Sequence, residues 1–151
     1  MAVKDGSVDI NAFQHYNFLD NWNSKNDNAL VAVADTYIAP IRLYSGTENG
    51  NNKYTSIKEI PKGGTIAVPN DPTNESRALY VLQSAGLIKL DTKDGQLANV
   101  SNIKENSKDL KISELDASQT PSALPSVDAA VINNTFVREA GVDFKKAIYV
   151  E

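Results

Sequence analysis

A turn that joins a short apolar run to an amphipathic segment places the strongest constraint on how this chain folds. Residues 65–68, Thr-Ile-Ala-Val, have the length and composition of a buried strand, and Asn70-Asp71-Pro72 follows almost directly. Asp71 predicts a helix N-cap and Pro72 the first helical position, because proline lacks an N–H that would be unsatisfied there. A helix is predicted over 72–85, so the carboxyl end of a strand leads straight into a helix N-terminus.

The same alternation of strand-like and helix-like segments continues along the chain. Apolar runs predict strands over 8–12, 29–34, 37–44, 65–68, 87–90, 110–115, 127–132 and 147–150, and helices are predicted over 18–22, 56–59, 72–85, 117–124 and 135–140. The runs 29–34 and 127–132 are continuously apolar, which predicts strands covered on both faces. Strands alternating with short helices are typical of an α/β fold with a largely parallel sheet. The Gly- and Asn-rich stretch 45–54 lacks periodicity and marks a boundary between subdomains.

Composition excludes several classes of protein. The 151 residues suffice for one ordinary domain, or for one and a half lobes of something larger. The net charge of −4, from 19 acidic and 15 basic residues, argues against a nucleic-acid partner, which requires a clustered basic face. The absence of cysteine excludes disulfides, thiolate metal sites and thiol nucleophiles. No apolar run reaches about 18 residues, so no membrane span or signal peptide is predicted.

Polar residues follow three of the predicted strands. They are Phe13-Gln14-His15, Asn70 with Asn74 and Arg77, and Asn133-Asn134. Because ligands of open α/β sheets bind outside the carboxyl ends of the strands, we expect these side chains to meet there. An arginine fork can hold a carboxylate, and an asparagine can accept from an ammonium or donate to a carboxylate. The sequence therefore predicts a site for a small zwitterion whose apolar part packs on the aromatic residues.

Other interpretations remain open at this stage. Taken singly, each residue has an ordinary role: an exposed arginine, turn and cap asparagines, a structural histidine, core aromatics. One histidine, no cysteine and no Gly-x-Ser-x-Gly turn leave no recognisable nucleophile, and no metal-ligand cluster or phosphate loop is found, so no cofactor is predicted. The alternatives are a small α/β transferase or isomerase that uses His15 with an acid, and a fragment without retained binding.

Five stretches carry a resemblance to a known family. They are Phe13-Gln14-His15, Tyr37-Ile38-Ala39-Pro40 with Leu43-Tyr44-Ser45, residues 66–79 with Asn70-Asp71-Pro72-Thr73-Asn74 and Arg77, residues 82–88, and residues 128–133. Together they resemble the methionine-binding lipoproteins of the NlpA/MetQ family, the substrate-binding components of methionine ABC importers. The match runs through nearly the whole chain, and the Asn-Asp-Pro-Thr-Asn stretch with its downstream arginine is its most specific part.

The resemblance implies a type 2 periplasmic-binding-protein-like fold. Such a fold has two lobes, each a small mixed sheet flanked by helices, that close on the ligand about a hinge. Family members are longer, with a signal and a lipid-bearing cysteine, so the chain is expected to be truncated at both ends with lobe one incomplete. The implied division is 1–45 as partial lobe one with hinge strands, 46–54 as linker loop, 55–145 as lobe two, and 146–151 as a return segment toward lobe one. Strand edges exposed in this way are open to self-association.

The resemblance also implies residue roles around the amino-acid backbone of the ligand. Arg77 corresponds to the family's arginine that grips the carboxylate. Asn74 and Asn133 correspond to polar contacts of the amino-acid backbone, and Asn70 lies in the same motif.

The remaining implied contacts concern the ligand side chain. Phe13 and His15 are expected near it, while Tyr37 stands where many members carry histidine and Ala39-Pro40 replaces the family's Glu-Pro. The resemblance implies L-methionine or a related apolar amino acid as the ligand, and the two departures keep a short peptide open as an alternative. The implied partners are an ABC permease and its ATPase, and the implied location is extracytoplasmic, with a lipid anchor in the full-length protein.

Overall fold

The computed structural model describes residues 2–93 and 96–151, and the chain divides into two compact units. The first unit ends at Ile38 and the second runs from Ala39 to Glu151. The stretch 46–54, predicted as a linker, lies inside the second unit. The assignment of residues to two lobes stays a prediction.

The first unit contains one regular element among its described residues, the helix α1 (Tyr16–Asn23), which confirms the helix predicted over 18–22. His15 is its N-cap, because Nδ1 accepts a hydrogen bond from the Phe18 N–H at 3.2 Å. The strands predicted over 8–12 and 29–34 are wrong, since neither segment is in a ladder among the described residues of this unit. A strand requires a neighbouring backbone to satisfy its N–H and C=O groups, and residues 2–38 offer none.

The second unit is built on a mixed sheet of five strands. In spatial order they are β7 (Lys111–Leu115), β4 (Thr65–Pro69), β8 (Ala129–Ile132), β1 (Arg42–Ser45) and β9 (Ala147–Val150). β4 pairs in parallel with β7 and β8, whereas β1 pairs antiparallel with β8 and β9. The expectation of a largely parallel sheet is therefore wrong for the edge that β1 and β9 form, because apolar periodicity carries no information on strand direction.

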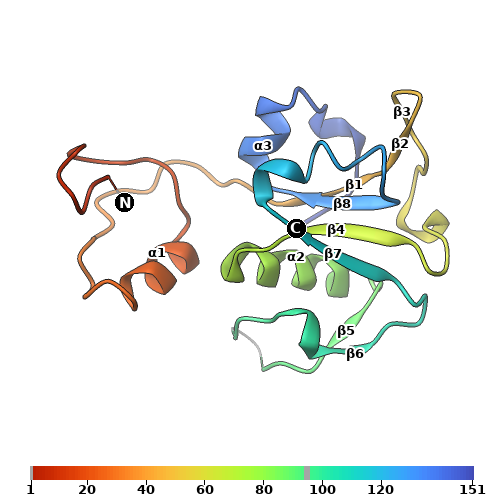
Figure 1. The fold of residues 1–151 in the computed structure, drawn as a ribbon, viewed down its shortest axis with the longest axis horizontal. Helices are drawn as coiled ribbons and strands as arrows, with labels where there is room; N and C mark the ends of the chain where they lie inside the picture. The colour runs from red at the N-terminus through yellow and green to blue at the C-terminus, as the bar shows by residue number, and fades with distance from the viewer. Residues whose placement is uncertain (1, 94–95) are drawn as a thin grey trace. The chain divides into compact units, whose positions relative to one another are not determined.

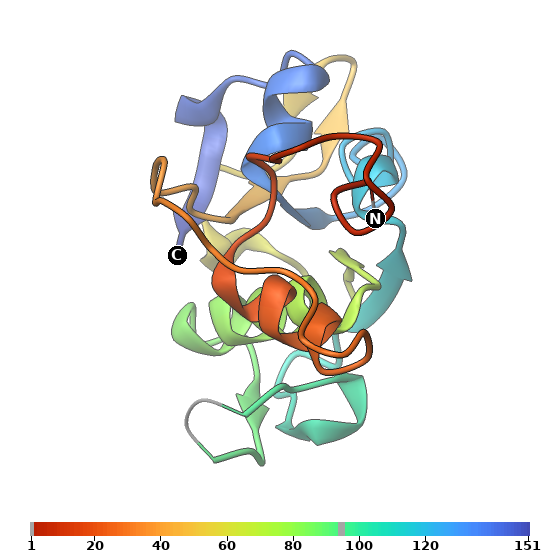
Figure 2. The same cartoon turned by 90° about the vertical axis from the view of Figure 1, so that its left-hand side faces the viewer.

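The helix α2 (Pro72–Ser84) and the helix α3 (Asn134–Glu139) cover opposite faces of this sheet (Figure 1). Figure 2 shows the same layering from the side, with the sheet between the two helices. On the α2 face, Leu79 and Leu82 pack in one core cluster with Ile66 and Val68, and on the α3 face Ala67 packs with Val137 and Tyr44. Successive residues of β4 thus supply the two cores in turn, as the alternation of side chains in a strand requires.

The ends of both helices show why they start where they do. Asp71 caps α2 by accepting from the Asn74 N–H at 3.1 Å, which confirms the predicted start, and α2 ends one residue before the predicted end, where Gly86 follows with a φ of +73°. The helix predicted over 135–140 is observed as α3, which begins and ends one residue earlier. Asn133 is the cap, because its carbonyl accepts the first helical hydrogen bond, from the Val137 N–H at 3.1 Å.

Short elements complete the second unit. They are the hairpin β2 (Thr47–Glu48) with β3 (Asn51–Asn52), the pair β5 (Lys89–Leu90) with β6 (Ile103–Glu105), and the 3-10 helices η1 (Ile57–Glu59), η2 (Val100–Asn102), η3 (Ala117–Gln119) and η4 (Phe144–Lys146). The strand predicted over 37–44 is shifted to β1, which begins beyond Pro40. The helix predicted over 117–124 is reduced to η3, which ends before Pro121 as the missing proline N–H favours.

Candidate ligand-binding site

The carboxyl ends of β4 and β8 bring two of the predicted polar groups into direct contact. The two strands are parallel neighbours, so the turn after β4 and the residue after β8 lie at the same edge of the sheet. There the Asn133 Nδ2 donates a hydrogen bond of 2.7 Å to Asn74 Oδ1, across 59 positions of sequence. The structure thus joins the Asn70-to-Arg77 stretch to Asn133 at the edge where ligands of α/β sheets bind.

Asp71 anchors this contact from the other side. The Asn74 Nδ2 donates to both carboxylate oxygens of Asp71, at 3.1 and 3.0 Å, and the Thr73 hydroxyl donates to one of them at 3.0 Å. Sequence reasoning found Asp71 only as a helix cap. The same carboxylate therefore also holds the side chain of a predicted ligand contact.

The Asn133 Oδ1 is the unmet polar atom of this group. It is buried and has no hydrogen-bond partner among the described residues, and Asn133 makes no side-chain cap bond to α3. A buried acceptor without a donor costs about 1–3 kcal/mol. A donor from a ligand would remove that cost.

Arg77 lies one turn into α2 and is held along one side of its guanidinium. Its Nε donates to Glu151 Oε1 at 3.0 Å, and its Nη2 donates to Glu151 Oε2 and, at 3.3 Å, to the Ala39 carbonyl. Glu151 Oε2 also accepts from the Ile41 N–H at 3.0 Å. The remaining nitrogen, Nη1, has no partner in the part of the chain that the structure describes and is not buried. Arg77 thus keeps a pair of donors for a carboxylate.

The neighbouring asparagines do not share this arrangement. Asn70 is exposed, and its backbone N–H donates to the Leu115 carbonyl at 2.8 Å, which extends the pairing of β4 with β7. Asn134 Oδ1 accepts from Arg42 Nη1 at 2.8 Å, while the Arg42 guanidinium lies 5.1 Å from the centre of the Phe144 ring. Asn134 therefore has a structural partner, and Asn70 is at the rim of the group.

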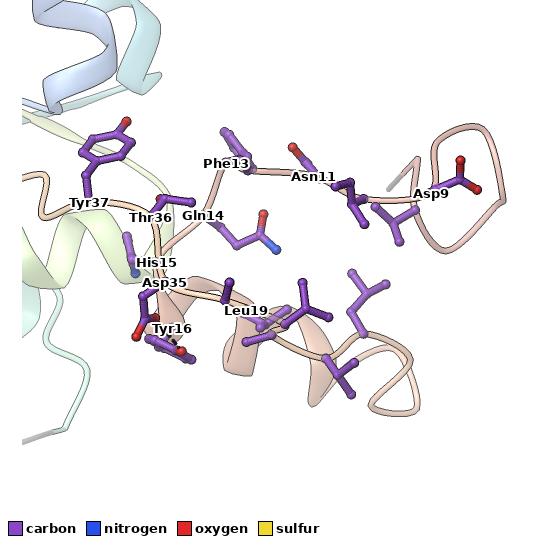
Figure 3. Close-up of a pocket in the computed structure, with 18 of the residues that line it drawn as sticks. Asp9, Asn11, Phe13, Gln14, His15, Tyr16, Leu19, Asp35, Thr36 and Tyr37 are labelled. Atoms are coloured by element: carbon purple, nitrogen blue, oxygen red, sulfur yellow. Dashed lines mark hydrogen bonds between the residues drawn. The ribbon is translucent and has the colours of Figure 1, made fainter.

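The other three predicted site residues line a cavity of about 840 Å³ within the first unit (Figure 3). Phe13, His15 and Tyr37 all border it, and the side chains of Phe13 and Tyr37 are 67% and 70% exposed. The Tyr16 hydroxyl donates to Asp35 Oδ1 at 2.7 Å on the same wall. These residues are brought together with one another, and their meeting with Arg77, Asn74 and Asn133 stays a prediction.

Sequence reasoning gave no individual role to two residues that have an unsatisfied or clamping role, although Gln14 belongs to the predicted Phe13-Gln14-His15 stretch. Gln14 points into the cavity of Figure 3, and its Oε1 is buried without a partner in residues 2–93 and 96–151. Glu151 clamps Arg77 from 74 positions away. The position of Gln14 after a predicted strand carried a signal, whereas no local pattern marks Glu151.

One acidic side chain of α2 has a shifted pKa. Burial raises the pKa of Glu75, in the first turn of α2, although the Val100 N–H that donates to it at 3.0 Å acts in the opposite direction. In the first unit, His15 Nδ1 is the acceptor that caps α1. No group of three metal-ligating side chains occurs within residues 2–93 and 96–151, and no described helix is long and apolar enough to cross a membrane.

Two curated proteins illustrate the similarity of this chain to known sequences. The D-methionine-binding lipoprotein MetQ of Escherichia coli is 42% identical over 153 residues, which cover 99% of this chain and 54% of that protein. The probable D-methionine-binding lipoprotein MetQ of Vibrio cholerae is 42% identical over 151 residues, with the same two coverages of 99% and 54%. The chain spans about half the length of these curated relatives.

Solved structures extend the similarity to the fold. The substrate-binding protein of a methionine transporter from Streptococcus pneumoniae is 67% identical, with a TM-score of 0.97 over 99% of this chain and 58% of that one. A nutrient-binding protein from Burkholderia cenocepacia, bound to methionine, is 45% identical, with a TM-score of 0.91 over 99% of this chain and 61% of that one. The expected α/β fold of periplasmic-binding-protein type is confirmed.

The family model described as NlpA lipoprotein matches residues 1–151. This match covers every stretch that carried the resemblance, from Phe13-Gln14-His15 to Asn133. The chain therefore belongs to the NlpA lipoprotein family.

Proposed function

We propose that this chain supplies part of the amino-acid site of an ABC-importer substrate-binding protein, and that the ligand is L-methionine or a related apolar amino acid. The observation that carries this proposal is the hydrogen bond of 2.7 Å between Asn133 and Asn74, which joins two strand ends beside Arg77. As a result, the Asn133 Oδ1 acceptor and the Arg77 Nη1 donor lie at the same edge of the sheet. The choice of ligand is supported by the S. pneumoniae substrate-binding protein of a methionine transporter and by the B. cenocepacia protein bound to methionine.

Each predicted site residue has a role in this proposal. Arg77 binds the ligand carboxylate, and Asn74 and Asn133 contact the amino-acid backbone with Asn70 at the rim. The residues of the first unit, Phe13, His15 and Tyr37, contact the apolar side chain.

The free energy that each contact with the ligand contributes determines how many contacts the site needs. A charge-assisted hydrogen bond contributes about 1.5–3 kcal/mol, and burying a methionine side chain contributes about 1.5–3 kcal/mol. A micromolar dissociation constant corresponds to about 8 kcal/mol. The backbone contacts of the second unit therefore have to act together with apolar contacts elsewhere in the protein.

The transport role implies further partners. The complete protein delivers its ligand to an ABC permease driven by an ATPase, from an extracytoplasmic position with a lipid anchor, and it needs no cofactor. The curated relatives are named lipoproteins and not enzymes, so the hypothesis of a transferase or isomerase using His15 gains no support. The outer strands of the sheet, β7 and β9, offer edges for self-association with a second copy.

Calorimetry with L-methionine tests the proposal. It is done on the 151-residue chain and on this chain joined to those parts of the S. pneumoniae protein that it does not match. Arg77→Ala should weaken binding at least about tenfold, because it removes a charge-assisted pair. Arg77→Lys should recover little of the affinity, since a single ammonium cannot hold Glu151 in the geometry of Nε and Nη2 and also present a separate nitrogen to the ligand carboxylate.

Arg138 provides the matched control, because it is an exposed arginine in the last turn of α3, at the end of that helix opposite Asn133. Arg138→Ala should leave the affinity unchanged. The absence of heat with L-methionine in both proteins, or an unchanged affinity in Arg77→Ala, would contradict the proposal.

A further inference from the structure

The hydrogen-bonding chemistry of Asp71 determines which way the neighbouring amide faces. An ionised carboxylate only accepts hydrogen bonds, so the group of Asn74 that meets it must be the donor Nδ2. Both carboxylate oxygens are used, at 3.1 and 3.0 Å. A reversed Asn74 amide would bring its carbonyl oxygen against two acceptor oxygens. The orientation of Asn74 is therefore fixed by Asp71.

The same reasoning carries the orientation on to Asn133. With its nitrogen turned to Asp71, Asn74 presents Oδ1 to Asn133, and the atom that meets this acceptor at 2.7 Å must be the Asn133 Nδ2. Reversing Asn133 would place two acceptors in contact. The three side chains thus form one directed series from a carboxylate to the Asn133 carbonyl.

The far end of this series is an acceptor with no donor. Asn133 Oδ1 is buried and unmet by the described residues. An asparagine at a helix N-cap ordinarily accepts from a backbone N–H of the first turn, yet Asn133 makes no such bond to α3. Its carbonyl is therefore held away from the local partner that the backbone offers.

We propose that Asp71 is a positioning residue which, through Asn74, turns the Asn133 carbonyl toward the ligand as the acceptor for its ammonium group. This inference rests on the proposed function and adds to it the direction in which the amino acid lies in the site. The ammonium binds at Asn133, and the carboxylate binds at the open Nη1 of Arg77. The chemical class of ligand is an α-amino acid with a free ammonium, which excludes acids that lack the amino group.

The experiment compares two probes in two variants of the complete protein used for calorimetry above. The probes are L-methionine and its desamino analogue, in which hydrogen replaces the ammonium. Asp71→Ser keeps an N-cap residue for α2 but is too short to hold the Asn74 amide. Asp143 is a matched control, because it caps η4 through the Lys145 N–H at 2.9 Å in the same way, beside the end of β9 that lies farther from the site.

We expect Asp71→Ser to weaken the binding of L-methionine at least about tenfold and that of the desamino analogue less than about twofold, and Asp143→Ser to change neither. A general loosening of the site would weaken both probes equally, and that result overturns the inference while the proposed function stands. Equal affinity of the wild-type protein for both probes also overturns it. An absence of binding by the wild-type protein contradicts the proposed function instead.

A second measurement needs no ligand. The side-chain amide protons of Asn133 should exchange with solvent more slowly in the wild-type chain than in Asp71→Ser, because the series holds them in place. Unchanged exchange would show that Asp71 does not fix this amide and would overturn the inference, whatever the calorimetry shows.

Discussion

Two apolar runs of similar composition form different structures in the two units. Residues 29–34 of the first unit lie outside any strand and, apart from the half-buried Leu30, are exposed, with Val31 81% accessible, whereas Ala129–Ile132 of the second unit form β8 with all four residues buried. β8 lies between β4 and β1, which satisfy its backbone on both sides. The run 29–34 has no such neighbours among the described residues of its unit.

The difference shows that an apolar run can form a strand, but that it does so only where neighbouring strands pair with its backbone. A buried strand needs hydrogen bonds on both edges and cover on both faces. In the second unit α2 and α3 provide the cover (Figure 1). In the first unit α1 buries one residue, Leu19, among those described.

The largest expected effect comes from placing a carboxylate in each run. Val131 is fully buried opposite Leu43 of β1, so Val131→Asp should lower the free energy of unfolding by about 4 kcal/mol or more, because a buried unpaired charge must be desolvated. Val31→Asp should change it by less than about 0.5 kcal/mol. Urea unfolding followed by circular dichroism measures both. Comparable losses in the two variants would show that residues 29–34 are buried in solution and would remove the contrast between the units.

A smaller effect is expected where β1 ends against the strand β8. A Cβ on Gly46 would lie 2.0 Å from the Val127 carbonyl oxygen, and the Gly46 N–H donates to the Asp128 carbonyl at 2.7 Å. Backbone has to move to admit a methyl group, so Gly46→Ala should cost about 3 kcal/mol.

Gly6 of the first unit is the matched position. A Cβ there meets no atom within 4 Å, and only its φ of +77° opposes alanine, at a cost of about 1 kcal/mol. Urea unfolding of both variants measures this difference. A Gly46→Ala chain as stable as wild type would mean that the β1–β8 edge is loosely packed, like the first unit.

Local chemistry explains which parts of the fold could be predicted from the sequence. The end of β4, the Asp71 cap and the start of α2 were predicted because each depends on residues a few positions apart. The direction of β1 could not be predicted in this way. Its antiparallel register, which pairs Arg42 with Ile132 and Ser45 with Ala129, depends on where a strand from the far part of the chain lies and on no local pattern.

The site likewise has contacts that local spacing predicts and contacts that it does not predict. The Asn70-to-Arg77 stretch is short and its polar residues could be grouped from spacing alone, whereas the contact of Asn74 with Asn133 spans 59 positions and that of Arg77 with Glu151 spans 74. Such pairs follow from strand order, and strand order is a property of the whole sheet. The sequence did not indicate that Asp71 also holds the side chain of Asn74, because the position of Asp71 as a helix cap already explained why an aspartate stands there.

The smallest expected effect concerns a tyrosine–aspartate pair that occurs in both units. The Tyr54 hydroxyl donates to Asp128 Oδ1 at 2.8 Å in the second unit, and the Tyr16 hydroxyl donates to Asp35 Oδ1 at 2.7 Å in the first. Asp128 also accepts from the Thr65 N–H at 2.8 Å, which ties Tyr54 to the start of β4. Tyr54→Phe should therefore lower the free energy of unfolding by about 1 kcal/mol at neutral pH, and Tyr16→Phe should leave it unchanged.

The alkaline pH dependence sharpens this contrast. Burial, and then the hydrogen bond to the Asp128 carboxylate, raise the pKa of Tyr54 from 10 to about 12, so the folded chain holds this proton more tightly than the unfolded chain does. The stability that Tyr54 contributes is present below pH 10 and is lost as the pH rises from 10 to about 12. Denaturant unfolding across this range should show a shallower alkaline loss in Tyr54→Phe than in wild type. The hydrogen bond to Asp35 raises the pKa of Tyr16 as well, but its side chain is 54% exposed, so Tyr16→Phe should follow the wild-type profile. An equal change in both variants would mean that the Tyr16–Asp35 pair stabilises the first unit as the Tyr54–Asp128 pair stabilises the second.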